Sequence, residues 1–172
     1  MNNKIYKFPV IFWGKEKSTK VQFKISNSMP LDAKSVTSVM CAVYRGEQIL
    51  LVKPKRGWGL PGGHIEIAES PIDAIKRECA EEASIEIKNI KLVGYWEANK
   101  IKEVEENKKY PRRGYQLLYI AEIDKIHEFD GEFEVTDRKF VNPHDISSLH
   151  HNFKDFEVIL QYLIDLKGDG NA

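Results

Sequence analysis

The segment that most constrains this chain runs from residue 54 to residue 63, where four glycines and two prolines fall within ten positions. Glycine and proline interrupt regular structure, so the segment is predicted to be a loop. It follows two apolar runs, residues 36–44 and 49–52, which the link at residues 45–47 is predicted to join as a hairpin of strands. A glycine-rich loop after a strand allows backbone atoms to approach a ligand closely.

A helix with a well-defined start follows this loop. Ser70 suits the N-cap, Pro71 suits the first helical position, and Asp73 can complete a capping pair. Apolar residues recur on one side of this helix and are predicted to face a sheet. These residues are Ile72, Ile75, Cys79 and Ala83.

Strands and helices alternate along the rest of the chain, which predicts an α/β fold. The predicted elements are strands at residues 20–25, 91–96, 115–123 and 140–143, a terminal helix at 153–166, and a loop of mixed charge at 99–114. A length of 172 residues favours a single domain, residues 1–172. Residues 1–30 are expected to form a peripheral N-terminal extension of it.

Charge and cysteine content narrow the class of protein. The 26 basic residues balance the 26 acidic ones, so nucleic acid is an unlikely partner, because nonspecific nucleic-acid binders usually carry a basic excess. The two cysteines, Cys41 and Cys79, lie in apolar segments and are expected to be buried free thiols. The apolar run at residues 8–13 is too short for a signal peptide or a membrane span. A cytoplasmic protein with no membrane partner is expected.

Three glutamates, Glu78, Glu81 and Glu82, share one face of the predicted helix. They could form a solvated acidic face, where like charges cost only about 0.2–0.5 kcal/mol each. In a cleft, two such charges about 6 Å apart would repel by roughly 3 kcal/mol, and a divalent cation would relieve that repulsion. The energies leave both interpretations open. The preceding glycine loop favours a magnesium–phosphate site, because carboxylate and carbonyl oxygens are ligands that Mg²⁺ prefers.

The spacing of these residues resembles a known family motif. The order Gly63, five residues, Glu69, seven residues, then residues 77–85 is similar to the Nudix box, G-x5-E-x7-R-E-U-x-E-E-x-G-U, where U is bulky and apolar. Six of the seven fixed positions match, and Cys79 and Ile85 are acceptable at the U positions. The departure is Ser84, which stands where the family has a glycine at the helix end. That departure puts the helix end in doubt and removes no charged ligand.

The resemblance implies a Nudix-type α/β/α sandwich with a mixed β-sheet. It implies an Mg²⁺-dependent hydrolase that cleaves a phosphoanhydride bond in a nucleoside diphosphate linked to another moiety, with Mn²⁺ as an alternative metal. A nucleoside triphosphate or another nucleotide derivative would be the small-molecule substrate. The implied catalytic residues are Glu81, Glu78, Glu82, Arg77 and Glu69, and the implied metal ligands are Glu78, Glu81, Glu82 and the Gly62 carbonyl. Arg77 paired with Glu69 is expected to orient the helix.

Residues outside the motif are candidates for supporting roles. Glu134, or alternatively Glu132, could supply an additional carboxylate, although both could be ordinary surface charges. Lys53, Arg56 and Gly63 are candidate substrate-binding residues. Three further features are expected to have supporting or no direct roles. His64 is expected to stabilise its loop, and the histidines at residues 150–151 are expected to be an exposed pair without a metal. The loop at 99–114 could be either a lid or a solvated segment.

Two other functions stay open at this point. A non-catalytic Nudix-fold module would bind a nucleotide or regulate a partner, but such modules often lose box glutamates, and all four are present here. A strongly basic face would favour an RNA 5′-end pyrophosphohydrolase, and the neutral net charge argues against that function. A homodimer also stays open. Specificity depends on loops and strands outside the box, so the substrate does not follow from the motif.

Overall fold

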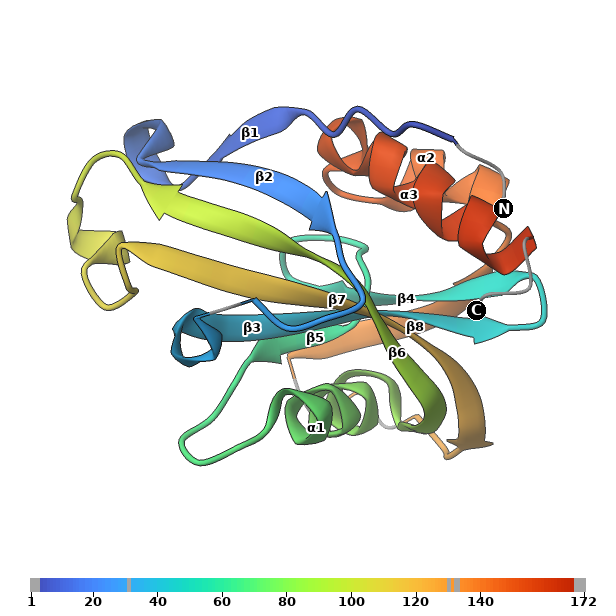
Figure 1. Ribbon diagram of the computed structural model, residues 1–172. Helices are drawn as coiled ribbons and strands as arrows, with labels where there is room; N and C mark the ends of the chain where they lie inside the picture. Colours follow the sequence, from blue (N-terminus) through green and yellow to red (C-terminus); the bar gives the residue numbers. More distant parts are fainter. Residues whose placement is uncertain (1–3, 31, 130, 132–133, 169–172) are drawn as a thin grey trace.

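The computed structural model describes residues 4–30, 32–129, 131 and 134–168. Within this part of the chain, eight strands form one sheet in the order β1-β2-β6-β7-β3-β4-β8, with β5 paired to β3 (Figure 1). β3 and β7 pair in parallel and the other pairs are antiparallel, so the sheet is mixed, as predicted. The strands are β1 Val10–Trp13, β2 Thr19–Ile25, β3 Val36–Arg45, β4 Gln48–Pro54, β5 Gly62–His64, β6 Ile85–Lys100, β7 Arg113–Ile126 and β8 Val135–Val141.

Helices cover both faces of this sheet. Helix α1, Pro71–Ala83, lies on one face, and helices α2, Ile146–Leu149, and α3, Phe153–Gly168, lie on the other (Figure 1). Each face has its own hydrophobic core, one built around α1 and one around α3. This arrangement confirms the predicted α/β/α sandwich. None of the helices in the described part of the chain is long and apolar enough to cross a membrane.

Helix α1 begins and ends as its local sequence dictates. The Ser70 hydroxyl accepts a hydrogen bond from the Asp73 N–H at 3.1 Å, so the predicted N-cap is present. Ser84 ends the helix in a left-handed conformation, φ 49° and ψ 48°, the conformation for which glycine is preferred at this position. The side chain of Arg138 donates to the Ser84 carbonyl at 3.2 Å and to the Ala83 carbonyl. These bonds satisfy acceptors at the helix end, which therefore lies where the motif places it.

One residue of α1 was assigned to the wrong environment. Ile75, Cys79 and Ala83 are fully buried against the sheet, as predicted. Ile72 was predicted to face the sheet as well, but it is 37% exposed. The buried side of α1 begins at Ala74, so Ile72 lies in a first turn that the sheet does not cover.

The N-terminal segment is more central than expected. The strand predicted at residues 20–25 is present as β2, and it pairs with β6 along all seven of its residues. Val21 and Phe23 are buried in the α3-side core, so the description of residues 1–30 as peripheral is wrong for β2. The reason is the length of β6, which extends to Lys100 and supplies an edge for β2.

Other element boundaries differ from the predicted ones because strand pairing lengthens the strands. β6 and β7 are both longer than the predicted strands, which shortens the predicted loop at 99–114 to residues 101–112. The last strand, β8, begins at Val135 and not at residue 140. The terminal helix and the hairpin of β3 and β4 are present as predicted.

Candidate active site

The glycine loop places two backbone positions directly against the box helix. The predicted loop at residues 54–63 is wrong at its end, where Gly62 and Gly63 pair with β3 as part of β5. A Cβ atom at Gly62 would lie 2.3 Å from the Val39 carbonyl oxygen, and one at Gly63 would lie 2.2 Å from Glu78 Oε1. A side chain at either position would force a shift, since real Cβ contacts are essentially never below 3.0 Å; the obstacle is backbone at Gly62 and the end of a side chain at Gly63. The Gly62 N–H also donates to Glu82 Oε2 at 2.8 Å.

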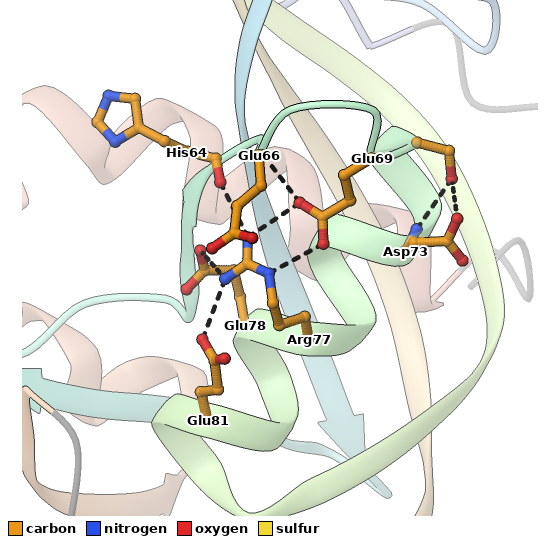
Figure 2. Close-up of polar contacts among 8 residues, drawn as sticks. His64, Glu66, Glu69, Asp73, Arg77, Glu78 and Glu81 are labelled. Atoms are coloured by element: carbon orange, nitrogen blue, oxygen red, sulfur yellow. Dashed lines mark hydrogen bonds and ion pairs between the residues drawn. The ribbon is translucent and has the colours of Figure 1, made fainter.

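Arg77 is the centre of the polar network at this site (Figure 2). Its Nε and Nη2 atoms donate to the two Glu69 oxygens at 2.9 and 3.1 Å, so the implied pair is present as a bidentate contact. Its Nη1 atom donates to Glu78 Oε1 at 2.9 Å and to Glu81 Oε2 at 3.0 Å. Nη2 also donates to the His64 carbonyl at 3.0 Å. One guanidinium therefore joins the loop, strand β5 and helix α1.

The site carboxylates have different electrostatic environments. Burial raises the pKa of Glu82 to about 7, although the Gly62 N–H bond opposes the shift. Burial also raises the pKa of Glu78, against the opposing effect of Arg77. The pKa of Glu69 is lowered by its hydrogen bonds from Arg77. Two carboxylates are thus held in surroundings that disfavour their negative charge, while the third is stabilised as an anion.

The three box glutamates do not converge as a bare cluster. Arg77 lies between Glu78 and Glu81, and Glu82 is turned toward Gly62. Among the described residues, no group of three or more His, Cys, Asp or Glu side chains is arranged as a metal centre. The acidic face is therefore not fully solvated, because Arg77 bonds to two of its glutamates.

Some of the supporting residues predicted from sequence lie at the site, and others do not. Arg56 lies near Glu82, and its positive charge partly opposes the rise in the pKa of Glu82. The negative charge of Glu134 adds to that rise. Lys53 has its ammonium 5.7 Å from the ring centre of Trp58 and does not line the cavity described below. Glu132 falls outside the described residues.

A cavity of about 580 Å³ lies between the sheet and the start of α3. Its volume is within the range of small-molecule sites. Gly62 and Gly63 line it and also contact the box carboxylates, so β5 lies between the cavity and the acidic face. Other side chains that line it come from the sheet, from the loop before β5 and from α3, and include Trp13, Met40, Arg56, Trp96, Gln116 and Phe156.

The two histidines at residues 150–151 line the cavity, so their assignment as an exposed pair is wrong for His150. The His150 ring is half-buried and stacks on Phe156, with centroids 4.4 Å apart and an interplanar angle of 7°. His151 Nδ1 donates to the Trp58 carbonyl at 2.8 Å. The periodicity of a helix cannot reveal this contact, because both histidines precede α3. Phe156, on the predicted apolar face of the terminal helix, is the nearest residue whose position the sequence pattern predicted.

The loop that joins β6 to β7 forms part of the cavity wall. Tyr110 lies in the loop at residues 101–112, and its hydroxyl lies 3.0 Å from His64 Nε2, with the two rings stacked. His64 thus holds the loop, consistent with the loop-stabilising role expected of it. Asn107 is buried and fixes the loop from within, donating to the Lys102 carbonyl at 2.9 Å. The basic residues of this loop do not line the cavity, whereas Tyr110 and Pro111 do.

Comparison with known proteins agrees with this geometry. The model of the NUDIX domain matches residues 34–162, about three quarters of the chain. The chain belongs to the Nudix family. Two Bacillus subtilis (strain 168) proteins are similar to this Nudix chain: YjhB, 38% identical over 61 residues, and the uncharacterized Nudix hydrolase YvcI, 43% identical over 56 residues. These alignments cover 34% and 31% of this chain, and only 29% and 35% of the relatives' own lengths.

Solved structures share the fold of this Nudix chain at low identity. The Bacillus subtilis pyrophosphohydrolase BsRppH matches with a TM-score of 0.68 and 22% identity, over 88% of this chain and 93% of that one. The NUDIX domain of Shewanella oneidensis NrtR, solved in complex with ADP ribose, matches with a TM-score of 0.56 and 20% identity, over 77% and 88% of the two chains. The fold is thus shared well beyond the box, over 88% of this chain in the first of these structures.

The Nudix chain should lose stability in mild acid because of His150. Burial lowers the pKa of this histidine from 6.5 to about 4. Between these values only the unfolded state takes up the proton, so the free energy of unfolding falls as the pH drops from about 6.5 toward 4. We expect His150→Phe to flatten this fall by about 2 kcal/mol, measured by urea unfolding at pH 7 and pH 4.5. His144→Gln, at an exposed histidine, is the control and should leave the slope unchanged.

Proposed function

We propose that this Nudix protein is an Mg²⁺-dependent hydrolase that cleaves a phosphoanhydride bond in a nucleoside diphosphate linked to another moiety. The observation that carries the proposal is a pair of carboxylates, the buried Glu78 and the half-buried Glu82, held against Gly62 and Gly63 beside the cavity. Carboxylates disfavoured as anions by burial are stabilised by a divalent cation, which can also bind the phosphates of a substrate. A nucleotide in the cavity would place its phosphates at β5.

The residues at this site fit a hard divalent cation. Glu78, Glu81, Glu82 and the Gly62 carbonyl all offer oxygen atoms, the ligands that Mg²⁺ prefers; Mn²⁺ is the alternative metal. The two raised pKa values also fit, because a cation would favour the charged form that burial disfavours. When bound, Mg²⁺ would neutralise the diphosphate and lower the pKa of water for attack on phosphorus.

The chain's own residues would then bind, orient and transfer a proton. Arg56, at the cavity wall near Glu82, would contact a phosphate of the substrate. Arg77, held by Glu69, would fix the orientation of α1 and its carboxylates. A box glutamate, or Glu134 beside Glu82, would take the proton of the attacking water.

The cellular setting is part of the proposal. Cys41 and Cys79 are free and buried, which supports a reducing, cytoplasmic location. A homodimer and a role on RNA 5′ ends stay as alternatives. A non-catalytic binding module is the runner-up, and the presence of all four box glutamates in one network with Arg77 favours hydrolysis over it.

The test is hydrolysis across a panel of nucleoside di- and triphosphates, nucleotide sugars, dinucleotides and a 5′-triphosphorylated RNA oligonucleotide. We expect turnover with Mg²⁺ and its loss in EDTA, recovered when Mg²⁺ is restored, since the metal supplies the attacking water. Release of phosphate or of a nucleoside monophosphate shows which anhydride is cut. Tight nucleotide binding without turnover of any substrate would instead establish the binding module.

A further inference from the structure

One row of side chains crosses the floor of the cavity on four adjacent strands. The strand register places Trp96 of β6 opposite Gln116 of β7, Gln116 opposite Ser38 of β3, and Ser38 opposite His64 of β5. All four residues line the cavity. The row therefore leads from the edge of the proposed phosphate site, at β5, to the aromatic part of the cavity, at β6.

Gln116 is the unusual member of this row. The β7 residues that follow it on the same face, Leu118 and Ile120, are buried in the α3-side core. The Gln116 side chain is half-buried, and no hydrogen bond joins its amide to the described residues. A partly buried amide normally has partners for its donor and its acceptor. Its place on the cavity floor means that a bound molecule can supply both.

The distance along the row suits a nucleotide. This step rests on the proposed function, which places the phosphates at Gly62 and Gly63. Adjacent strands are about 4.8 Å apart, so β7 lies two spacings, about 10 Å, from β5. That span is of the order of the distance between the phosphates and the base of an extended nucleotide. A nucleotide lying across the row would bring the edge of its base to Gln116.

We propose that Gln116 hydrogen-bonds the edge of the substrate's base, in a pocket that favours a purine. The amide offers one acceptor and one donor side by side, and the edge of adenine offers an amino N–H donor next to a ring-nitrogen acceptor. The O6 and N1–H groups of guanine offer an acceptor beside a donor, so the amide fits either purine. Trp96 and Phe156, which also line the cavity, provide apolar surface for a bicyclic ring.

The test measures binding separately from hydrolysis. ADP, GDP and CDP are titrated by calorimetry into wild-type protein, Gln116→Leu and Gln116→Glu, with Mg²⁺ present, and the corresponding triphosphates are assayed for turnover. Gln22→Leu is the matched control, because Gln22 is an exposed glutamine on β2. Thermal unfolding of each variant checks that it is folded. These titrations do not require catalysis, so the base preference can be read even if no nucleotide is hydrolysed.

We expect wild-type protein to bind ADP and GDP more tightly than CDP, and Gln116→Leu to lose about 5- to 150-fold in affinity for both purine nucleotides, as one paired base contact predicts. Gln116→Glu should shift the preference toward GDP, since a carboxylate accepts two hydrogen bonds from the N1 and N2 donors of guanine. A folded Gln116→Leu that binds all three nucleotides like wild type would overturn the inference, as would wild-type preference for CDP. Hydrolysis without base preference would overturn it and leave the proposed function intact.

Discussion

Replacing Glu82 by glutamine is expected to lower metal-dependent turnover by at least about 100-fold while the protein stays folded. Glutamine keeps an oxygen that can accept the Gly62 N–H bond, now 2.8 Å long, so the contact between α1 and β5 survives. What is lost is the negative charge, which the proposed roles in metal binding and proton transfer both require. The measurement is kcat on the best substrate of the panel, together with the urea midpoint of the variant.

A control variant distinguishes the loss of a charge at this site from the loss of a charge elsewhere. Glu157→Gln removes one negative charge from an exposed position on α3, so its turnover should match that of wild type. Glu81→Gln, measured in parallel, compares a carboxylate bonded to Arg77 with Glu82, which is bonded to the Gly62 N–H. If Glu82→Gln turned over substrate at the wild-type rate, Glu82 would have no part in the chemistry and the proposed site would be wrong.

Replacing Gly63 by alanine should also lower turnover by about 100-fold, with a much smaller effect on stability. The new Cβ would lie 2.2 Å from Glu78 Oε1, so the carboxylate must move and leave its 2.9 Å contact with Arg77 Nη1. A displacement of about 1 Å in a catalytic group can cost a factor of about 100 in rate. The fold should persist, because only the end of a flexible side chain has to move.

The neighbouring glycine gives the contrasting result. At Gly62 a Cβ would meet the Val39 carbonyl oxygen at 2.3 Å and Met40 Cα at 2.8 Å, and φ is 154°. The obstacle is backbone within the sheet, so Gly62→Ala should lower the free energy of unfolding by about 2–4 kcal/mol, measured by urea unfolding. Gly168→Ala, which meets no atom within 4 Å, controls for the added methyl group. Equal stability losses for Gly62→Ala and Gly63→Ala would contradict this account.

The parts of the fold that local sequence specifies were predicted well. The N-cap at Ser70, the hairpin of β3 and β4, and helix α3 depend on residues a few positions apart, so their signals are contained in short windows. The strand lengths were predicted less well. β6 extends to Lys100 because β2 and β7 pair with it, and no local pattern records a partner that lies far away in the sequence.

The candidate site, too, was predicted only in part. The motif identified the box residues, and it implied the pair of Arg77 and Glu69, which are eight positions apart on one loop and helix. It did not indicate that the same arginine also bonds to Glu78 and Glu81 and thereby prevents a bare acidic cluster. That outcome depends on side-chain geometry after α1 has packed on the sheet.

By itself, the sequence determined the family motif, the helix that carries its carboxylates and the α/β class, because each follows from spacing, capping or the alternation of elements, and the resemblance to the family implied the layered sandwich. Only the tertiary structure decided what lines the cavity. His150 comes to lie beside Gly59, about ninety positions away, and Gln116 takes its place between Trp96 and Ser38 through strand register. These residues share no local pattern, since the contacts that join them form only when distant strands pair and α3 packs over the sheet.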